Sequence, residues 1–595
     1  MKELFYLNKY FVKYKWKILL GIVFVSLSNY FRVLQPQAIR EALDLVINNI
    51  GVFGMFDGSP HQEVLFAQLG KTLLYFGGLV LLFALTMGIF MYFMRQTIIV
   101  MSRLIEYDMR KELFAKYESL DLAFYKKNNT GDLMSRVSED VSKVRMYVGP
   151  ALLYGINLVS LFVMVIWSMI EVSPTLTFYS LLPLPFLSIS IYYVSSLINK
   201  KSEVIQQQLA TLNSTAQESY SGIRMIKSYV QELSMVGIFR EQSEDYMEKS
   251  LGLARINAMF FPLMIFLIGA SIIITVYMGG LQVVSGAITP GNIAEFVIYV
   301  SMLTWPVTAI GWIASIIQQA EASQKRINEF LKIDPAIASP VISEKKFQGS
   351  IRFDNVSFNY PDSGIVGLEN VSFDLKPGQR LAILGKTGAG KSTIADLLVR
   401  MYDVSSGKIL IDGEDIKSLD LFNLRKRVGY VPQDVFLFSD TVSGNIGFGT
   451  DSYDQKEVEK FAGYAAVHED ILGLSEGYES MVGERGVTLS GGQKQRVSIA
   501  RALIKKPDII VLDDCLSAVD TNTEQKILSF LNGVLKDKTT IIITHRIYSL
   551  LKFDHIIVLE NGRIAEQGTH EQLIKNDGFY FDLFERQRAE EAKIQ

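Results

Sequence analysis

Six long apolar runs in the first 330 residues constrain the fold of this chain more than any other feature. They lie near residues 18–47, 72–100, 146–171, 174–199, 257–281 and 293–317. A helix needs about 20 residues to cross roughly 30 Å of hydrocarbon, so each run is long enough to span a membrane. The mean hydropathy of +0.22 is also high for a soluble protein. The sequence therefore predicts an α-helical six-span transmembrane domain over residues 1–330.

Lysine and arginine are distributed unevenly between these runs. Basic residues gather in segments 1–17, 101–145 and 200–255 and are absent from 41–70, 146–199 and 257–324. The positive-inside rule places the basic segments in the cytoplasm. This alternation predicts a multi-pass protein of the cytoplasmic membrane with both termini cytoplasmic. A large soluble helical domain would not separate its charges in this way.

The two internal basic segments also have helix-forming sequences, at 125–145 and 213–232. We expect them to continue the spanning helices into the cytoplasm as long helical extensions. Natural turn points on these extensions are Asn128, Asn129, Gly131, Ser221 and Gly222.

The pattern changes after residue 330. Residues 331–349 contain two prolines and read as a linker. The segment 351–360, IRFDNVSFNY, then alternates apolar and polar residues as a half-buried strand does. Strands, glycine loops and helices follow in turn, which predicts a soluble α/β domain over residues 350–585 and a charged tail over 586–595.

The stretch GKTGAGKS, residues 385–392, is a phosphate-binding motif between an apolar strand and a helix. Its backbone N–H groups would wrap the phosphates of ATP at a helix N-terminus, where the helix dipole favours negative charge. Lys391 is expected at the β- and γ-phosphates, and Ser392 as a ligand of Mg²⁺. The predicted nucleotide-binding residues here are Gly385, Lys386, Thr387, Gly388, Ala389, Gly390, Lys391, Ser392 and Thr393. With this motif, the soluble domain is predicted to be an α/β P-loop nucleotide-binding domain.

Two acids follow the apolar strand that begins at Ile509. Asp513 ends this strand, where a carboxylate can lie next to Mg²⁺, and Asp514 comes directly after it. A separate motif, LSGGQKQR at 489–496, puts a glycine pair before a helix. Its backbone N–H groups and Ser490 could bind phosphate again. Because the chain already has a phosphate loop, this second one makes sense if it serves a nucleotide held by another chain.

These motifs, in this order and spacing after six spans, resemble the half-transporters of the ATP-binding cassette exporter family over nearly the full length. The resemblance implies roles for further residues. Tyr360 is similar to the aromatic that stacks on adenine, Gln433 to a glutamine that senses Mg²⁺, and His545 to a histidine at the γ-phosphate. The matching signature residues are Ser490, Gly491, Gly492 and Gln493. The segment SAVD, which ends at Asp520, resembles the loop that couples two nucleotide sites.

The resemblance also implies where the two parts of the chain communicate. The segment VGERG at 482–486 resembles the one that touches the cytoplasmic loops of the membrane half. The excursions around 125–135 and 216–227 resemble the coupling helices that receive this contact.

Asp514 departs from the family pattern, in which a glutamate usually polarises the attacking water at this position. A general base acts only within hydrogen-bond reach of its proton, and aspartate is one methylene shorter. Basicity matters less, since the two side chains differ by only about 0.4 pKa units. Heterodimeric exporters often carry this substitution in one chain, so the resemblance implies a degenerate-site subunit whose partner has glutamate. A homodimer with a slower aspartate base is the alternative.

The cargo is less constrained by the sequence. The resemblance favours export of small amphiphilic compounds or lipid flipping, with an ATP-gated regulator without transport as another alternative. A net charge of −3 gives no signal for a nucleic-acid partner. Arg32 falls deep in the first span, where it would either contact cargo or pair with an acid on a neighbouring helix. Met and aromatic residues of the spans could line an adaptable cavity or face lipid: Met259, Phe260, Phe261, Met264, Met302 and Trp305. The single cysteine, Cys515, reads as a small packing residue.

Overall fold

A computed structural model gives the fold of the chain and describes residues 2–56, 58–339, 345–483, 486, 488–547 and 552–594. The chain forms two compact units. The first comprises Met1–Tyr117 and Gly131–Ile333, and the second comprises Glu118–Thr130 and Asp334–Gln595. The second unit thus combines the C-terminal half with a short excursion from the N-terminal half.

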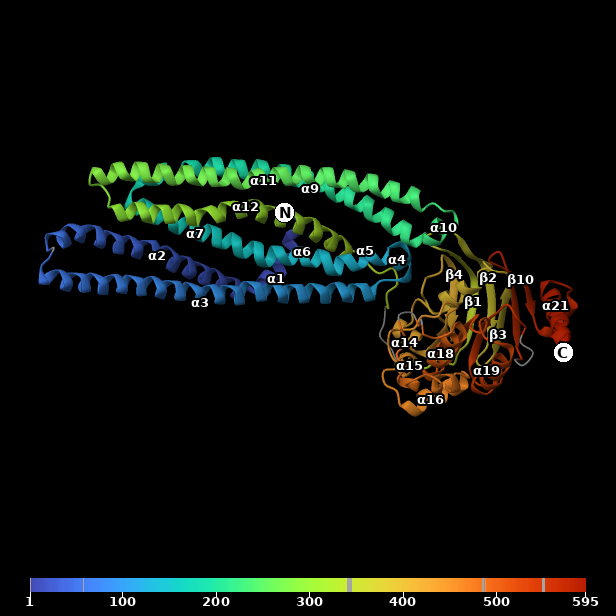
Figure 1. The fold of residues 1–595 in the computed structure, drawn as a ribbon. Helices are drawn as coiled ribbons and strands as arrows, with labels where there is room; N and C mark the ends of the chain where they lie inside the picture. Colours follow the sequence, from blue (N-terminus) through green and yellow to red (C-terminus); the bar gives the residue numbers. More distant parts are fainter. Residues whose placement is uncertain are drawn as a thin grey trace. The chain divides into compact units, whose positions relative to one another are not determined.

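The first unit is entirely helical among its described residues (Figure 1). Six of its helices are long and apolar enough to cross a membrane, as the sequence predicts. Their main segments are α2 (Lys15–Met55), α3 (Pro60–Ser119), α7 (Leu152–Val172), α9 (Pro183–Ser221), α11 (Glu232–Val284) and α12 (Pro290–Leu331). The shorter elements are η1 (Glu3–Leu7), α1 (Asn8–Lys13), α5 (Thr130–Ser135), η2 (Arg136–Asp140), α6 (Val141–Met146), η3 (Tyr147–Ala151), α8 (Pro174–Leu181) and α10 (Ile223–Ser228).

Several helices are far longer than the hydrocarbon layer requires. Helix α3 has 60 residues, which corresponds to about 90 Å at about 1.5 Å per residue. Helices α9 and α11 run side by side in Figure 1, and α9 ends at Ser221 with Gly222 as its C-cap. The predicted helical extensions are therefore present, and the turn near Gly222 is confirmed.

Ion pairs hold the N-terminal segment to the basic part of α3. Lys9 contacts Glu112 at 2.6 Å, and Lys13 contacts Asp108 at 2.5 Å. On the same helix, Glu106 pairs with Arg103 and Arg110 of α3 and, at 3.5 Å, with Arg145 of α6. These pairs join the N-terminal segment and α6 to the cytoplasmic part of α3 predicted from the sequence.

The second unit contains two sheets. The four-stranded sheet has the order β2-β1-β4-β5 and antiparallel pairing, whereas the six-stranded sheet has the order β10-β9-β3-β8-β7-β6. In the larger sheet β9, β3, β8, β7 and β6 are parallel and β10 is antiparallel. The strands β7 and β8 are buried along their whole length, as expected where helices cover both faces of a parallel sheet.

The elements of this unit alternate as the α/β prediction requires. The strands are β1 (Ile351–Asn359), β2 (Val366–Leu375), β3 (Arg380–Gly385), β4 (Ser406–Ile411), β5 (Glu414–Asp415), β6 (Val428–Val431), β7 (Ile509–Asp513), β8 (Thr539–Ile543), β9 (His555–Glu560) and β10 (Arg563–Gly568). The helices are α13 (Lys391–Leu398), α14 (Leu421–Arg427), α15 (Val442–Gly447), α16 (Gln455–Tyr464), α17 (His468–Leu472), η4 (Gly477–Glu479), α18 (Gly491–Ile504), α19 (Thr521–Val534), α20 (His570–Lys575) and α21 (Phe579–Ile594).

One short helix from the N-terminal half belongs to this second unit. Helix α4 (Leu122–Lys127) begins at Asp121, whose side chain accepts a hydrogen bond from the backbone N–H of Phe124 at 3.0 Å. Leu122 and Ala123 pack against the apolar core beneath the four-stranded sheet. The helix ends at Asn128, one of the predicted turn points. The contact that the resemblance implies for this excursion, with the segment VGERG, stays a prediction.

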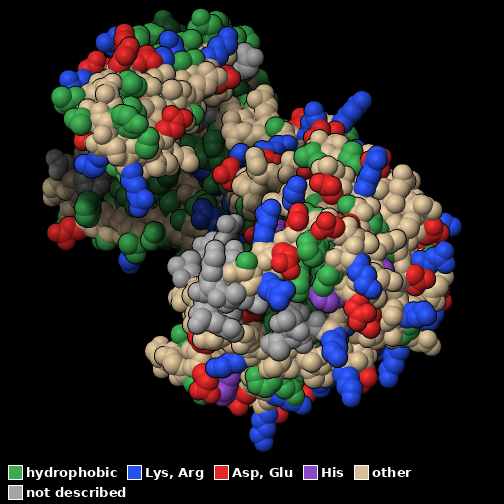
Figure 2. All heavy atoms as spheres, turned by 90° about the vertical axis from the view of Figure 1, so that its right-hand side faces the viewer, with side chains coloured by type: hydrophobic (Ala, Val, Ile, Leu, Met, Phe, Trp, Pro, Cys, Tyr) green, Lys and Arg blue, Asp and Glu red, His purple; other side chains and the backbone are tan. Residues whose placement is uncertain are grey.

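The surface and core of the second unit separate polar from apolar residues. Basic and acidic side chains are interspersed over the face of this unit seen in Figure 2. Cys515 is buried in a core that includes Val497 and Leu512, and burial raises the pKa of its thiol to about 12. It is a packing residue, as predicted. Residues 340–344 of the predicted linker, and Glu484 and Arg485 of VGERG, lie outside the described residues.

Candidate nucleotide site

The parallel strands bring the predicted nucleotide-binding residues to one edge of the larger sheet. Strand β8 lies between β3 and β7 and is parallel to both. The carboxyl ends of the three strands therefore meet at the same edge, which carries the phosphate loop, Asp513 and His545. Gln433 follows β6, which is parallel to β7. In open α/β sheets this edge is where ligands bind.

The phosphate loop connects β3 to α13 through glycines that no other residue could replace without strain. Gly388 and Gly390 have φ values of 82° and 97°. A Cβ at Gly390 would also collide with the carbonyl oxygen of Gly367. The loop is therefore held against the neighbouring β2 strand, with backbone geometry suited to presenting N–H groups to an anion.

Lys391 is buried at the start of α13. Its ammonium donates hydrogen bonds to the carbonyl oxygens of Gly385 at 2.8 Å and Lys386 at 2.9 Å. Burial lowers its pKa, while the nearby Asp514 and Asp513 carboxylates act in the opposite direction. The cation is thus folded back onto its own loop and lies close enough to both acids to interact with them electrostatically.

Asp513 ends β7 in register with Ile543 of β8. Its side chain is almost fully buried, and burial raises its pKa to about 6, opposed by a hydrogen bond from Ser392. A carboxylate and a serine hydroxyl thus meet beside the phosphate loop. Such hard oxygen donors are the ligands that Mg²⁺ prefers.

Asp514 has an unusual backbone conformation. Its φ of 45° lies in the left-handed region, which aspartate tolerates better than most residues. Its backbone N–H donates to the carbonyl oxygen of Ile543 at 2.9 Å, and its carbonyl oxygen accepts from the Ser517 hydroxyl at 2.9 Å. Burial raises the pKa of its carboxyl, and the charge of His545 acts against this shift. The backbone at this position is therefore fixed by both neighbouring segments, so side-chain length decides its reach.

Tyr360 follows β1 and lies at the start of α13. Its hydroxyl shares a hydrogen bond of 2.8 Å with the hydroxyl of Thr393. Its ring packs edge-on against Tyr402, with 5.6 Å between the centroids. The ammonium of Lys126, from α4, lies 5.1 Å from the centre of the Tyr360 ring. The short helix α4 thus touches the residue predicted to stack on adenine.

His545 and Gln433 are both exposed. His545 lines a cavity of about 390 Å³ together with Gly385, Lys386, Thr387 and Phe579. Lys386 is itself largely exposed, and its ammonium lies 3.8 Å from the Glu560 carboxylate. His545 therefore faces the same cavity as the phosphate loop, whereas the Lys386 ammonium lies near a surface carboxylate.

The signature residues form the start of α18. The Ser490 hydroxyl accepts a hydrogen bond from the Gln493 backbone N–H at 3.3 Å, and the Gln493 side chain accepts from the Ser490 N–H at 3.0 Å. Gly491 is exposed and Gly492 is half-buried against Ala518. Among the described residues, no hydrogen bond or ion pair joins residues 490–493 to the phosphate loop. The motif is a preformed helix N-terminus separate from the chain's own phosphate loop.

Gln495 is a residue whose role our sequence analysis missed. Its side-chain oxygen accepts from the Ala518 N–H at 3.1 Å, and its amide donates to the Ser517 hydroxyl at 3.3 Å. It therefore ties α18 to the SAVD loop that follows Asp514. It lies within the motif LSGGQKQR, but no spacing rule predicts which side chain of a helix faces a loop about 20 residues later.

Asp520 ends the SAVD loop as the N-cap of α19. Its carboxylate accepts a hydrogen bond from the Thr523 N–H at 3.0 Å, which lowers its pKa. Ser517 and Ala518 are exposed next to it. The loop is thus pinned at both ends and presents its middle to solvent.

Both halves of the chain match known families with these features. Residues 18–307 match the ABC transporter transmembrane region and residues 368–517 match the ABC transporter domain. The chain belongs to the ABC transporter family. It is an exporter half-transporter, in which six spans precede one ATP-hydrolysing cassette. Exporters of this family act as dimers, and the chain is a multi-pass membrane protein.

Two relatives and a solved structure match most or nearly all of the chain. The chain is 36% identical to the probable multidrug resistance ABC transporter ATP-binding/permease protein YheI of Bacillus subtilis, over 98% of this chain and 97% of that one. It is 34% identical to an ATP-dependent lipid A-core flippase of Syntrophus aciditrophicus, over 81% and 80% of the two chains. A bacterial Atm1-family ABC exporter with ATP bound has a TM-score of 0.74, 28% identity and 98% coverage of both chains.

Proposed function

We propose that this chain is the degenerate-site subunit of a heterodimeric exporter in the cytoplasmic membrane, with both termini in the cytoplasm. It would move small amphiphilic compounds or lipids outward at the expense of ATP. The observation that carries this proposal is Asp514, which stands where the family usually has glutamate, in a chain whose signature motif is intact.

Two composite nucleotide sites would form between this cassette and its partner. At one, the phosphate loop, Asp513 and Asp514 of this chain would face the partner's signature motif. At the other, Ser490, Gly491, Gly492 and Gln493 would face the partner's phosphate loop and glutamate. The exposed, separately capped start of α18 supports a motif that serves a nucleotide on another chain.

Within the first site, different groups would bind the adenine, the phosphates and Mg²⁺. Tyr360 would stack on adenine, and the backbone of residues 385–393 with Lys391 would hold the phosphates. Ser392, Asp513 and Gln433 offer the oxygen ligands that fit Mg²⁺, which neutralises phosphate charge when bound. His545 would contact the γ-phosphate, and Asp520 would hold the loop between the two sites.

The weak step would be activation of water. The fixed backbone at Asp514 means that a side chain shorter by one methylene cannot recover its reach by a shift of the chain. A misplaced base can forfeit the typical contribution of about 10²–10⁴-fold to the rate. ATP would then be retained in this site while the partner's site turns over, and closure of the cassettes would drive the spans between inward-open and outward-open states.

The decisive experiment measures ATP hydrolysis by the purified chain alone in lipid, beside Asp514→Glu. We expect a nearly inactive wild type and a gain of at least about tenfold in the variant, because glutamate restores the distance to water. A melting curve for each protein controls for strain at the left-handed backbone position. Brisk hydrolysis by the wild type that Asp514→Ala abolishes would instead establish a homodimer with an aspartate base.

Transport is tested separately from hydrolysis. Uphill, ATP-dependent movement of an amphiphilic dye across vesicles that contain the assembled transporter would support export. ATP hydrolysis without any such movement would favour a gated regulator. Two relatives, a probable multidrug resistance protein and a lipid A-core flippase, support amphiphile export as the starting assumption.

A further inference from the structure

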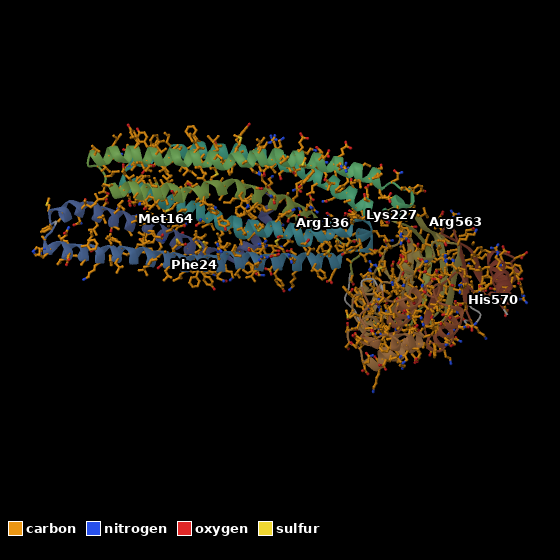
Figure 3. All side chains as sticks on the ribbon, in the orientation of Figure 1. Phe24, Arg136, Met164, Lys227, Arg563 and His570 are labelled. Atoms are coloured by element: carbon orange, nitrogen blue, oxygen red, sulfur yellow. The ribbon has the colours of Figure 1, made fainter. Side chains whose placement is uncertain are left out.

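A large cavity lies within the first unit, between α2, α3, α7 and α12. Its volume is about 780 Å³, which falls in the range of sites for drug-sized ligands. The α2 and α3 walls are joined by aromatic packing, since the ring of Phe24, labelled in Figure 3, stacks on Phe93 with 5.4 Å between centroids. The cavity is thus bounded by packed spanning helices and is a candidate cargo site.

Two arginines line this cavity, Arg32 from α2 and Arg95 from α3. Neither forms an ion pair with an acid among the described residues, and no acidic side chain is among those that line the cavity. The predicted alternative, that Arg32 pairs with an acid on a neighbouring helix, is therefore not what the described structure has. Ionisable groups at membrane depth are costly unless they face a partner or a water-filled cavity.

Arg40, another arginine of α2, is an example of a cation that has an acidic partner within the fold. The guanidinium of Arg40 lies 3.2 Å from the carboxylate of Glu295, whose side chain is fully buried. Tyr299 donates a hydrogen bond of 3.0 Å to the same carboxylate. Arg40 is thus neutralised within the fold, whereas Arg32, eight residues earlier on the same helix, faces a cavity without an acid.

The rest of the wall is apolar, aromatic and adaptable. The ring of Tyr154 packs edge-on against Trp305 at 5.4 Å and Trp312 at 5.5 Å, and both indoles remain partly exposed. Four methionines also line the cavity: Met87, Met91, Met94 and Met146. Aromatic rings and flexible thioethers accommodate apolar ligands of varied shape. Of the six Met and aromatic residues singled out in the sequence, Trp305 lines this cavity, and the side chain of Phe261 lies outside the described part of the chain.

Two further polar side chains of the wall, Ser28 and Asn29, form hydrogen bonds within the fold. The Ser28 hydroxyl donates to the carbonyl oxygen of Met87 at 3.3 Å, and the Asn29 amide donates to that of Asn157 at 3.2 Å. These bonds tie α2 to its neighbours. The guanidinium groups therefore supply the cavity's positive charge and its strongest hydrogen-bond donors.

We propose that this cavity binds amphiphiles that carry an anionic group, with the anion at Arg32 and Arg95 and the apolar body against Tyr154, Trp305 and Trp312. This inference rests on the proposed export function and names the chemical class of its cargo. The same charges would repel a cationic amphiphile of equal shape, so the site selects by charge as well as by hydrophobicity. A carboxylate, sulfonate or phosphate group on either a lipid or a small organic compound meets this requirement.

Binding to the full chain in nanodiscs, without ATP, tests the proposal directly. The probes are 11-(dansylamino)undecanoate, its neutral methyl ester and a trimethylammonium analogue of the same length, followed by energy transfer from tryptophan to dansyl. We expect the carboxylate to bind at least about tenfold more tightly than the cation. Equal affinity of the two would overturn the proposal.

Variants of the two arginines give the second arm of the test. The double variant Arg32→Gln/Arg95→Gln should weaken binding of the carboxylate about tenfold or more and leave the ester within about twofold. Arg32→Lys/Arg95→Lys should keep most of the preference, which separates charge from shape. Lys71→Gln, a cation elsewhere on α3, is the matched control and should change nothing. An equal loss for all three probes would contradict the charge-based site.

Labelled lipids in the same discs distinguish an anionic lipid from a small organic anion as the ligand. Preferential binding of a labelled phosphatidylglycerol over the same labelled phosphatidylcholine, lost in the double glutamine variant, would identify a lipid. If the double glutamine variant loses binding of the dansyl carboxylate but of neither lipid, the ligand is a small organic anion. These binding measurements need no ATP, so their outcome is independent of the transport assay. Selective binding of the anion without uphill transport would refute the export function only. Transport without a preference for anions would refute this inference only.

Discussion

The nucleotide edge of the cassette and the cavity of the spans differ in how their charged groups are satisfied. At the edge, Lys391 is bonded to the carbonyl oxygens of its own loop and lies near Asp513 and Asp514. In the cavity, Arg32 and Arg95 face open volume without an acid. The charged groups of the edge are therefore paired within the protein, whereas the two arginines of the cavity have no acidic partner among the described residues. This difference is what we expect if the edge binds one constant ligand and the cavity binds the anionic cargo that we propose.

The largest effect that would test this comparison is expected from Lys391→Ala. The variant removes the side-chain cation that we propose for the phosphates, so we expect ATP affinity at this chain to fall by about a hundredfold or more. Titration calorimetry of the full chain measures this directly. Lys386→Ala, in the same loop but largely exposed beside Glu560, is the control and should change affinity by less than about threefold. Similar losses in both variants would mean that the loop is not organised around Lys391.

A second test compares paired and unpaired arginines of the spans by stability. Glu295→Ala leaves the charge of Arg40 without its buried partner, and breaking such a pair costs about 3–5 kcal/mol. We expect a clear drop in melting temperature. Arg32→Gln removes a cation that has no ion pair among the described residues and should leave the melting temperature nearly unchanged. An equally large loss with Arg32→Gln would show that Arg32 stabilises the fold.

A smaller effect is expected from the link between α18 and the loop after Asp514. Gln495→Ala removes two hydrogen bonds from a buried side chain, each worth about 1 kcal/mol. We expect a moderate loss of thermal stability and slower ATP turnover by the assembled dimer, because the variant loosens the loop that we propose couples the two nucleotide sites. Gln495→Glu keeps the acceptor for Ala518 and should retain part of the activity. Full activity of the alanine variant would contradict the role of Gln495 in coupling the two sites.

The smallest effect concerns Lys126 of α4, which lies over the Tyr360 ring. A cation near a partly buried aromatic ring contributes modestly, so Lys126→Gln should lower ATP affinity by about two- to fivefold because Tyr360 is held less firmly. Lys127→Gln, the adjacent exposed residue, is the control and should leave affinity unchanged. An unchanged affinity in both variants would show that α4 contacts Tyr360 without influencing the nucleotide.

Local sequence was sufficient to predict much of this protein. Six apolar runs and the alternation of basic segments predict six spanning helices, because length and hydropathy are properties of consecutive residues. The phosphate loop is equally local, since its glycines, Lys391 and Ser392 lie within a few residues of one another. The strand ending at Asp513 needed only its apolar run and its distance from that loop.

Only the tertiary structure decided which distant groups meet. Arg32 and Arg95 come from different helices, and whether an acid reaches either depends on how those helices pack, as Arg40 and Glu295 show across about 250 residues. The contacts of Gln495 with Ser517 and of Lys126 with Tyr360 likewise join separate elements. Periodicity determines which face of a helix is apolar, but the partner of a buried charge is set by packing between elements, which no local pattern specifies.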